Sequence, residues 1–236
     1  MLNIENLNAG YFGSKVLNGI SLSVAEGTTL VAGANGAGKS TLIKSINGSL
    51  RPVSGSISMD DKDLKRLNSH SIALLGVATV PERGRVFGNM TVEDNLKVSF
   101  ESISRKRGAL EDALEGVYEF FPDLKEKKND KAGTLSGGQQ QMLSIGRAII
   151  TRPKLLLMDE PTTGLFPKTV KELVSKISYI SKGMSILLTE QNLADTMFIA
   201  KRVYILESGS IVYSGTPAEI SENPDLSRIY LGIRGS

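Results

Sequence analysis

A glycine-rich run near the start of the chain has the residue types and the spacing of a phosphate-binding loop. Residues 33–40 read GANGAGKS, fit the pattern G-x-x-x-x-G-K-[ST], and follow an apolar run over residues 28–32. Glycines let successive backbone N–H groups turn inward around phosphate oxygens, and the N-terminus of a following helix adds further N–H groups. Lys39 is expected between the β- and γ-phosphates, and Ser40 is expected to ligate Mg²⁺, which prefers oxygen donors. The run therefore predicts a nucleoside triphosphate site.

Two adjacent carboxylates at the end of an apolar run supply the second half of such a site. Residues 155–160 read LLLMDE. On a central parallel strand these carboxylates lie at the carboxyl edge of the sheet, where ligands bind. We expect Asp159 to hold Mg²⁺ through water and Glu160 to polarise the water that attacks the γ-phosphate. The alternative is an ordinary strand followed by a solvated acidic turn.

A third motif, at residues 135–139, has two competing interpretations. Ser136 and Gln139 have the spacing of a capping box, which would make the segment a helix start and nothing more. The two glycines between them, Gly137 and Gly138, are more than a cap requires. They suit a close approach of the backbone to phosphate at the N-terminus of a helix.

The composition excludes several other kinds of chemistry. The 236 residues include no Cys and one His, which excludes a disulfide scaffold, a thiolate zinc site, a Cys nucleophile and a multi-His metal site. The formal net charge is +3, and the most charged stretch, residues 101–131, mixes both signs, so nucleic-acid binding is not expected. No run approaches the ~18 apolar residues of a membrane span, and the N-terminus does not resemble a signal peptide. These features predict a soluble, cytoplasmic protein.

The motifs need elements that bring them together, and the apolar pattern predicts an α/β fold. Strands are expected at residues 2–7, 16–24, 28–32, 55–59, 77–80, 155–158 and 185–188, with a hairpin at 203–206 and 210–213. Helices are expected at 39–46, 69–75, 109–121, 138–150, 168–180, 193–200, 216–222 and 224–231, and a capping-box pattern opens another at 91–94. Continuous apolar strands alternating with helices indicate a mostly parallel sheet covered on both faces.

Together the three motifs resemble those of the ATPase subunit of ATP-binding-cassette (ABC) transporters. Ser136 lies 97 residues after Lys39 and Asp159 lies 23 residues after Ser136, which is normal spacing in that family. The resemblance covers nearly the whole chain. It implies a single domain, residues 1–236, of the P-loop NTPase class. Its parts are a RecA-like core (1–88 and 151–236), an N-terminal antiparallel β part, and an inserted helical subdomain at about 89–150 that carries the signature motif.

The resemblance also implies how ATP is held. Two chains close head to tail, and each ATP lies between the P-loop of one chain and the signature of the other, which here is Ser136, Gly137, Gly138 and Gln139. Tyr11 matches the aromatic residue that stacks on adenine, although taken alone it reads as a loop residue. The implied ATP-binding set is Tyr11, Gly33, Ala34, Asn35, Gly36, Ala37, Gly38, Lys39, Ser40 and Thr41. Lys39 and Glu160 are also implied in catalysis.

Two positions depart from the usual family pattern. Glu82 stands where most relatives have a Gln that reaches Mg²⁺, and Gln191 stands where most have a His that contacts the γ-phosphate. The blocks around them, VPERGRVFGNMTVEDNL and LLTEQN, resemble the second ATPase of branched-chain amino-acid importers, in which both departures are habitual. The resemblance therefore implies a metal role for Glu82 and a catalytic role for Gln191. The alternatives are a surface charge and a polar residue at a helix start.

These features predict an ATP hydrolase that uses Mg²⁺ and powers the import of a small solute, with the face around residues 87–100 turned toward a membrane permease. The resemblance implies permease subunits in the membrane and a second, non-identical ATPase, or a homodimer when the chain is alone. It also implies an indirect link to a periplasmic or surface solute-binding protein and a location on the inner face of the cell membrane. The alternatives are an importer of urea or another small polar solute, a soluble ABC protein of DNA repair, chromosome structure or translation, and a non-hydrolysing ATP-binding regulator.

Overall fold

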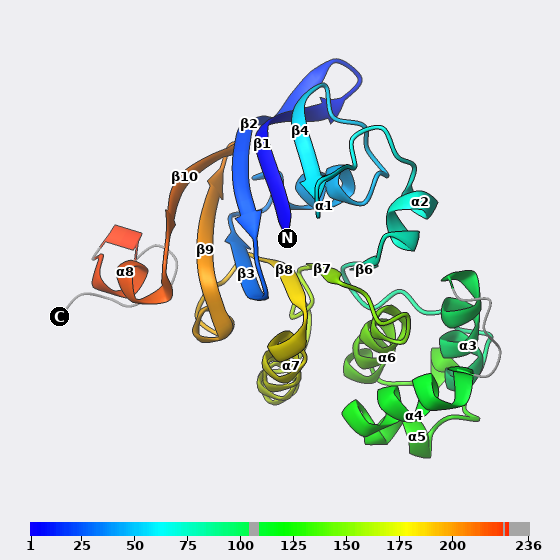
Figure 1. The fold of residues 1–236 in the computed structure, drawn as a ribbon. Helices are drawn as coiled ribbons and strands as arrows, with labels where there is room; N and C mark the ends of the chain where they lie inside the picture. Colours follow the sequence, from blue (N-terminus) through cyan, green and yellow to red (C-terminus); the bar gives the residue numbers. More distant parts are fainter. Residues whose placement is uncertain (104–108, 224, 227–236) are drawn as a thin grey trace.

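The strands form two sheets in the part of the chain that the computed structural model describes, residues 1–103, 109–223 and 225–226. The smaller sheet is antiparallel with strand order β2-β1-β4-β5, and the larger has the order β10-β9-β3-β8-β7-β6 (Figure 1). The strands of the smaller sheet are β1 (Leu2–Tyr11), β2 (Ser14–Val24), β4 (Ser54–Met59) and β5 (Lys62–Asp63). This sheet is the predicted N-terminal antiparallel part.

The larger sheet is parallel except at one edge, where β10 pairs antiparallel with β9. Its register pairs Ala32 with Glu190 and Asp159 with Thr189. The segments that follow residues 32, 159 and 190 therefore leave the sheet at the same edge. The strands are β3 (Gly27–Ala32), β6 (Val77–Val80), β7 (Leu155–Asp159), β8 (Ser185–Glu190), β9 (Ala200–Glu207) and β10 (Ser210–Gly215).

Alternating side chains of the larger sheet belong to two different cores. Leu155 and Leu157 pack in a core shared with the smaller sheet and α1 (Lys39–Ile46). Leu156 and Met158, on the same strand, pack in a second core with residues of the other helices. Successive residues of a strand point to opposite faces, so one wholly apolar strand serves both cores.

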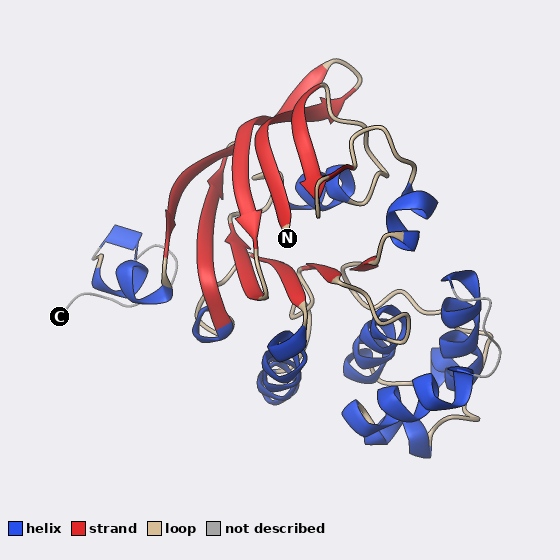
Figure 2. Cartoon of the chain, viewed as in Figure 1, coloured by secondary structure: helices blue, strands red, loops and turns tan. Residues whose placement is uncertain are grey.

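Most of the helices lie on the face of the larger sheet opposite the smaller one (Figure 2). Four of them gather in one group, the helical subdomain, away from the smaller sheet (Figure 1): α3 (Val92–Ile103), α4 (Leu110–Phe120), α5 (Pro122–Glu126) and α6 (Gly137–Ile149). The remaining elements are α2 (Ser69–Leu74), α7 (Pro167–Ile180), α8 (Pro217–Glu222) and the 3₁₀ turns η2 (Ala132–Thr134), η3 (Ser181–Gly183) and η4 (Met197–Ile199). None of the described helices is long and apolar enough to cross a membrane.

The predicted fold class is confirmed, and one predicted helix is wrong. Residues 193–199 form turns that include only η4, and Ala200 already begins β9. The Asn192 side chain accepts a hydrogen bond from Ala194 N at 2.9 Å, a local turn that competes with a helix. Pairing of Ala200 with Thr28 of β3 then draws the end of the segment into the sheet. The predicted helix at 224–231 lies outside the described residues except for 225–226.

Candidate functional site

The loop between β3 and α1 has the conformation that a phosphate-binding loop needs. Gly36 and Gly38 have φ angles of 83° and 112°, a region that glycine enters without steric penalty. A Cβ atom added at Gly33 would lie 2.3 Å from the carbonyl oxygen of Leu206, so that position has no room for a side chain. The first turn of α1, which begins at Lys39, leaves its N–H groups free for an anion at this loop.

The Lys39 ammonium is the buried cation of the loop. The side chain is 3% exposed, and Nζ donates hydrogen bonds to the carbonyl oxygens of Gly33 at 2.5 Å and Ala34 at 2.9 Å. Nζ also lies 3.1 Å from Oε1 of Glu160, which supplies the counter-charge that a buried cation requires. A phosphate that binds this ammonium must therefore compete with Glu160.

The end of β7 brings the two predicted carboxylates to the same edge. Oδ1 of Asp159 accepts a hydrogen bond from Thr189 Oγ1 at 2.9 Å, and Oε2 of Glu160 accepts one from Thr163 Oγ1 at 3.2 Å. Glu160 has a φ of 46°, a left-handed conformation that is uncommon for a residue with a side chain. Its backbone N–H donates to the Thr189 carbonyl at 3.0 Å, which holds the backbone in this conformation. Strain of this kind gathers at functional sites.

Two oxygen donors near this edge fit a magnesium ion. Among the described residues, the Ser40 hydroxyl has no hydrogen-bond partner, and only one oxygen of the Asp159 carboxylate is engaged. A free hydroxyl and a free carboxylate oxygen are hard donors of the kind that Mg²⁺ prefers. The Glu82 carboxylate pairs with Arg83 Nε at 3.0 Å and is 42% exposed. Its metal role stays a prediction.

Gln191 lies beside the phosphate-binding loop. It lines a hollow of about 510 Å³ together with residues 34–37 of the loop and residues 206–208 at the turn between β9 and β10. The Gln191 side chain is exposed there. Tyr11 is not part of this lining, and its ring lies 5.8 Å from the Lys44 ammonium. The predicted stacking of Tyr11 on adenine therefore stays a prediction.

The signature motif is a helix start with one unexplained glycine. Gln139 N donates to Ser136 Oγ at 3.3 Å and Ser136 N donates to Gln139 Oε1 at 3.1 Å, which completes the capping box. A Cβ atom at Gly138 would lie 2.6 Å from Thr169 Cγ2, so packing within the chain explains that glycine. A Cβ atom at Gly137 would meet nothing within 4 Å. Nothing within the described chain therefore requires Gly137, and its bare backbone is exposed.

A third carboxylate at the same edge, Glu190, was missed by sequence reasoning. It ends β8, is 2% exposed, and accepts hydrogen bonds at Oε1 from Thr162 N (3.1 Å) and Thr162 Oγ1 (2.8 Å). The pKa of Glu190 is raised to about 7, chiefly by burial and also by the charge of Glu160, and this net value already includes the lowering by hydrogen bonds from Thr162 and from the Gln191 backbone. The signal in the sequence was its place at the end of an apolar run, beside Gln191.

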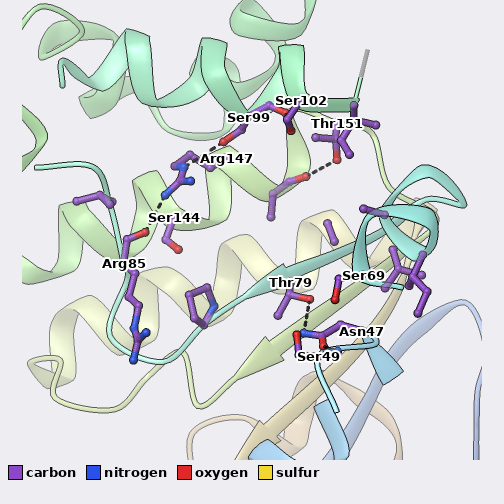
Figure 3. A pocket seen from close by; sticks show the side chains of 18 of the residues that line it. Asn47, Ser49, Ser69, Thr79, Arg85, Ser99, Ser102, Ser144, Arg147 and Thr151 are labelled. Carbon is purple, nitrogen blue, oxygen red and sulfur yellow. Dashed lines mark hydrogen bonds between the residues drawn. The ribbon is translucent and has the colours of Figure 1, made fainter. Parts of the chain in front are cut away.

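A groove of about 520 Å³ separates the core from the helical subdomain (Figure 3). Its walls come from α2, β6 and the loop after β6 on one side and from α3 and α6 on the other. Arg147 of α6 donates to Ser99 Oγ at 3.0 Å and to the Arg85 carbonyl at 2.8 Å, and its guanidinium lies 4.3 Å from the Phe87 ring. One half-buried cation therefore joins the loop after β6 to both helices.

The chain is similar to known ATP-binding subunits over nearly its whole length. The family pattern described as ABC transporter matches residues 17–163. BraG, a high-affinity branched-chain amino acid transport ATP-binding protein of Pseudomonas aeruginosa, is 40% identical over 235 residues, which are 98% of this chain and 100% of BraG. LptB, the lipopolysaccharide export system ATP-binding protein of Escherichia coli, is 31% identical, with 98% and 97% covered. The crystal structure of the ADP conformation of MJ1267, an ATP-binding cassette of an ABC transporter, matches with a TM-score of 0.86 at 29% identity and covers 99% of each chain. This chain therefore belongs to the ABC transporter family, whose ATP-binding cassettes are ATPases coupled to transport.

Proposed function

We propose that this chain powers the import of branched-chain or similarly apolar amino acids. The observation that carries the proposal is the 40% identity to BraG along both full lengths, against 31% to LptB of an export system. Glu82 and Gln191, the two departures from the usual pattern, agree with this assignment. The ATPase does not bind the solute in this scheme, so the solute is inferred from similarity alone.

The proposed chemistry relies on positioning and on electrostatic stabilisation of the transferring phosphoryl group. When bound, Mg²⁺ neutralises charge on the phosphates, and Ser40 and Asp159 are its proposed ligands, with Glu82 as a further oxygen donor. Lys39 and the loop amides hold the β- and γ-phosphates of ATP.

The contact between Lys39 and Glu160 gives the two residues linked roles. Because a phosphate competes with Glu160 for the ammonium, ATP binding releases this carboxylate. Glu160 is then free to orient the attacking water and accept its proton. Gln191, on the wall of the same hollow, hydrogen-bonds the γ-phosphate and the water but cannot carry a proton.

We infer that a second chain completes each site. Ser136 and Gly137 are exposed at the N-terminus of α6, where free N–H groups can meet an anion from outside the chain. Each ATP then takes Lys39, Glu160 and Gln191 from one chain and the signature from the other. The proposed partner in the cell is a non-identical ATPase, with weak homodimers when the chain is alone.

The groove in Figure 3 is the proposed docking place for the permease. Phe87, which lines the groove, is 46% exposed, and Met90 and Val98, which follow it in the chain, are 39% and 38% exposed. Exposed apolar side chains of this kind favour a partner. Docking there would hold the protein at the inner face of the membrane and link it, through the permease, to a solute-binding protein outside.

Uptake in the source cells tests the proposal. A strain that lacks this chain should lose uptake of labelled leucine, isoleucine or valine, and should regain it with the wild-type chain or with Glu172→Gln, a change on the exposed face of α7. Glu160→Gln should not restore uptake. Intact leucine uptake with a loss of urea uptake or of lipopolysaccharide export would assign the ATPase to a different transporter.

A further inference from the structure

Glu190 is a buried carboxylate to which the proposed chemistry gives no role. Its side chain accepts two hydrogen bonds from one residue, Thr162, through the backbone N–H and the hydroxyl. Burial of a carboxylate is unfavourable unless hydrogen bonds or charges compensate it. Glu160, another carboxylate of the site, adds like charge rather than compensation. Burial of the Glu190 carboxylate lowers the stability of the fold, so its presence here indicates a role in the function of the site.

Glu190 contacts or adjoins three segments of the proposed catalytic site. Its backbone carbonyl accepts a hydrogen bond from Gly33 N, the first residue of the P-loop, at 3.2 Å. Its side chain holds Thr162, two residues after Glu160. The next residue in the chain is Gln191. Glu190 is therefore the point at which the P-loop, the segment after Glu160 and the strand end that bears Gln191 are joined.

We propose that Glu190 is a positioning residue that fixes the segment after Glu160 to the end of β8, so that Glu160 and Gln191 keep a set separation around the γ-phosphate. The inference rests on ATP hydrolysis at this site. The proposed role of Glu190 involves no contact with ATP. Glu190 acts through Thr162, whose position sets the backbone that follows Glu160 and the Thr163 hydroxyl that binds Oε2 of Glu160.

Loss of this link should reduce the turnover number and leave ATP binding nearly unchanged. Removing a hydrogen bond to a charged group typically costs enough for a ten- to hundredfold effect, so in an assay at about pH 8, above the pKa of Glu190, Glu190→Ala should lower kcat by roughly that factor. The KM for ATP should change by less than about threefold, because Lys39 and the loop amides still hold the phosphates. Glu190→Gln keeps an acceptor oxygen and should restore most of the turnover.

Thr162 supplies a matched second test. Thr162→Val keeps the shape but loses the hydroxyl donor, so kcat should fall, whereas Thr162→Ser keeps the donor and should stay near the wild-type kcat. Because both residues act through one contact, Glu190→Ala combined with Thr162→Val should be hardly slower than Glu190→Ala alone. Glu172→Ala, on the exposed face of α7, is the control.

The measurements are steady-state phosphate release and ATP binding by calorimetry, on the full chain. The inference is overturned if Glu190→Ala keeps the wild-type kcat, or if its kcat and ATP affinity fall together. If Glu190→Ala does not fold, equal kcat values for Thr162→Val and Thr162→Ser overturn it instead. A wild-type chain that releases no phosphate would contradict the ATPase function itself, which separates the two failures.

Discussion

At the scale of single residues, Glu160 and a bound phosphate compete for the Lys39 ammonium. Two carbonyl oxygens and the Glu160 carboxylate contact the Lys39 ammonium. A buried ammonium needs such polar or charged partners. A bound phosphate and Glu160 cannot both be the first partner of this cation. The same contact that stabilises the buried lysine therefore links nucleotide binding to the position of the proposed catalytic carboxylate, Glu160.

The first prediction concerns Glu160→Gln. An amide cannot accept the proton of the attacking water, and general-base catalysis contributes about 10²–10⁴-fold, so turnover should fall by at least about a hundredfold. ATP should bind no more weakly than to the wild type, because a neutral side chain competes less for Lys39. Calorimetry with ATP and a phosphate-release assay measure the two quantities. Retained turnover, or clearly weaker ATP binding, would contradict the assigned role.

The second prediction concerns stability and Glu190. The folded protein holds this proton up to pH about 7, against a usual value of 4.5, so the free energy of unfolding should fall as the pH rises through that window. At 1.36 kcal/mol per pKa unit the loss is about 3 kcal/mol by pH 8. Glu190→Gln does not ionise and should lack this loss.

Urea unfolding at about pH 5 and about pH 8 measures the effect for the wild type, Glu190→Gln and the exposed control Glu172→Gln. The pH dependence should be weaker in Glu190→Gln alone. Equal pH dependence in all three proteins would show that Glu190 ionises normally in the fold.

At the scale of elements, the parallel sheet does most of the positioning. The ends of β3, β7 and β8 share one edge, so residues far apart in sequence meet there without any long loop. Sequence patterns could predict this much, because the P-loop spacing and the LLLMDE run each indicate a strand together with the polar residues at its carboxyl end. The helix at 39–46 was predicted at its observed bounds for the same reason.

Pairing between residues that are far apart in the chain could not be predicted from the sequence. The apolar spacing at residues 193–200 favours a helix, but Ala200 pairs with Thr28, which is distant in sequence. The burial of Glu190 could not be predicted from the sequence either. It depends on the segment that packs against Glu190, here the segment that carries Thr162. Both cases are tertiary contacts that override a local pattern.

The third prediction separates the two glycines at the start of α6. Gly138→Ala should destabilise the fold by about 1–3 kcal/mol, because its Cβ would overlap Thr169. Gly137→Ala should not destabilise it, yet should reduce turnover at least about tenfold, because the methyl group would stand where we propose that the partner's phosphate approaches.

Gly116→Ala is the matched control, since its Cβ also meets nothing within 4 Å. It should leave turnover unchanged. Thermal unfolding and phosphate release measure both effects. A Gly137→Ala protein with normal turnover would leave the capping box as the only role of this motif.

At the scale of the whole molecule, the signature and the P-loop of one chain are not joined. No hydrogen bond or ion pair connects residues 136–139 with residues 33–40 in the described parts of the chain. We therefore predict that hydrolysis needs two chains, because Ser136 is exposed and nothing within the described chain requires Gly137.

A mixture of two inactive variants shows whether two chains share one site. Lys39→Ala removes the phosphate-binding cation, and Gly137→Asp places an anion at the signature while remaining compatible with a helix N-terminus. Each variant alone should release almost no phosphate. In an equal mixture half of the dimers are mixed, and each mixed dimer has one of its two sites intact. The mixture should therefore reach about a quarter of the wild-type rate, at enzyme concentrations where the wild-type rate per chain has levelled off. A mixture no more active than its separate components would contradict a site shared between two chains.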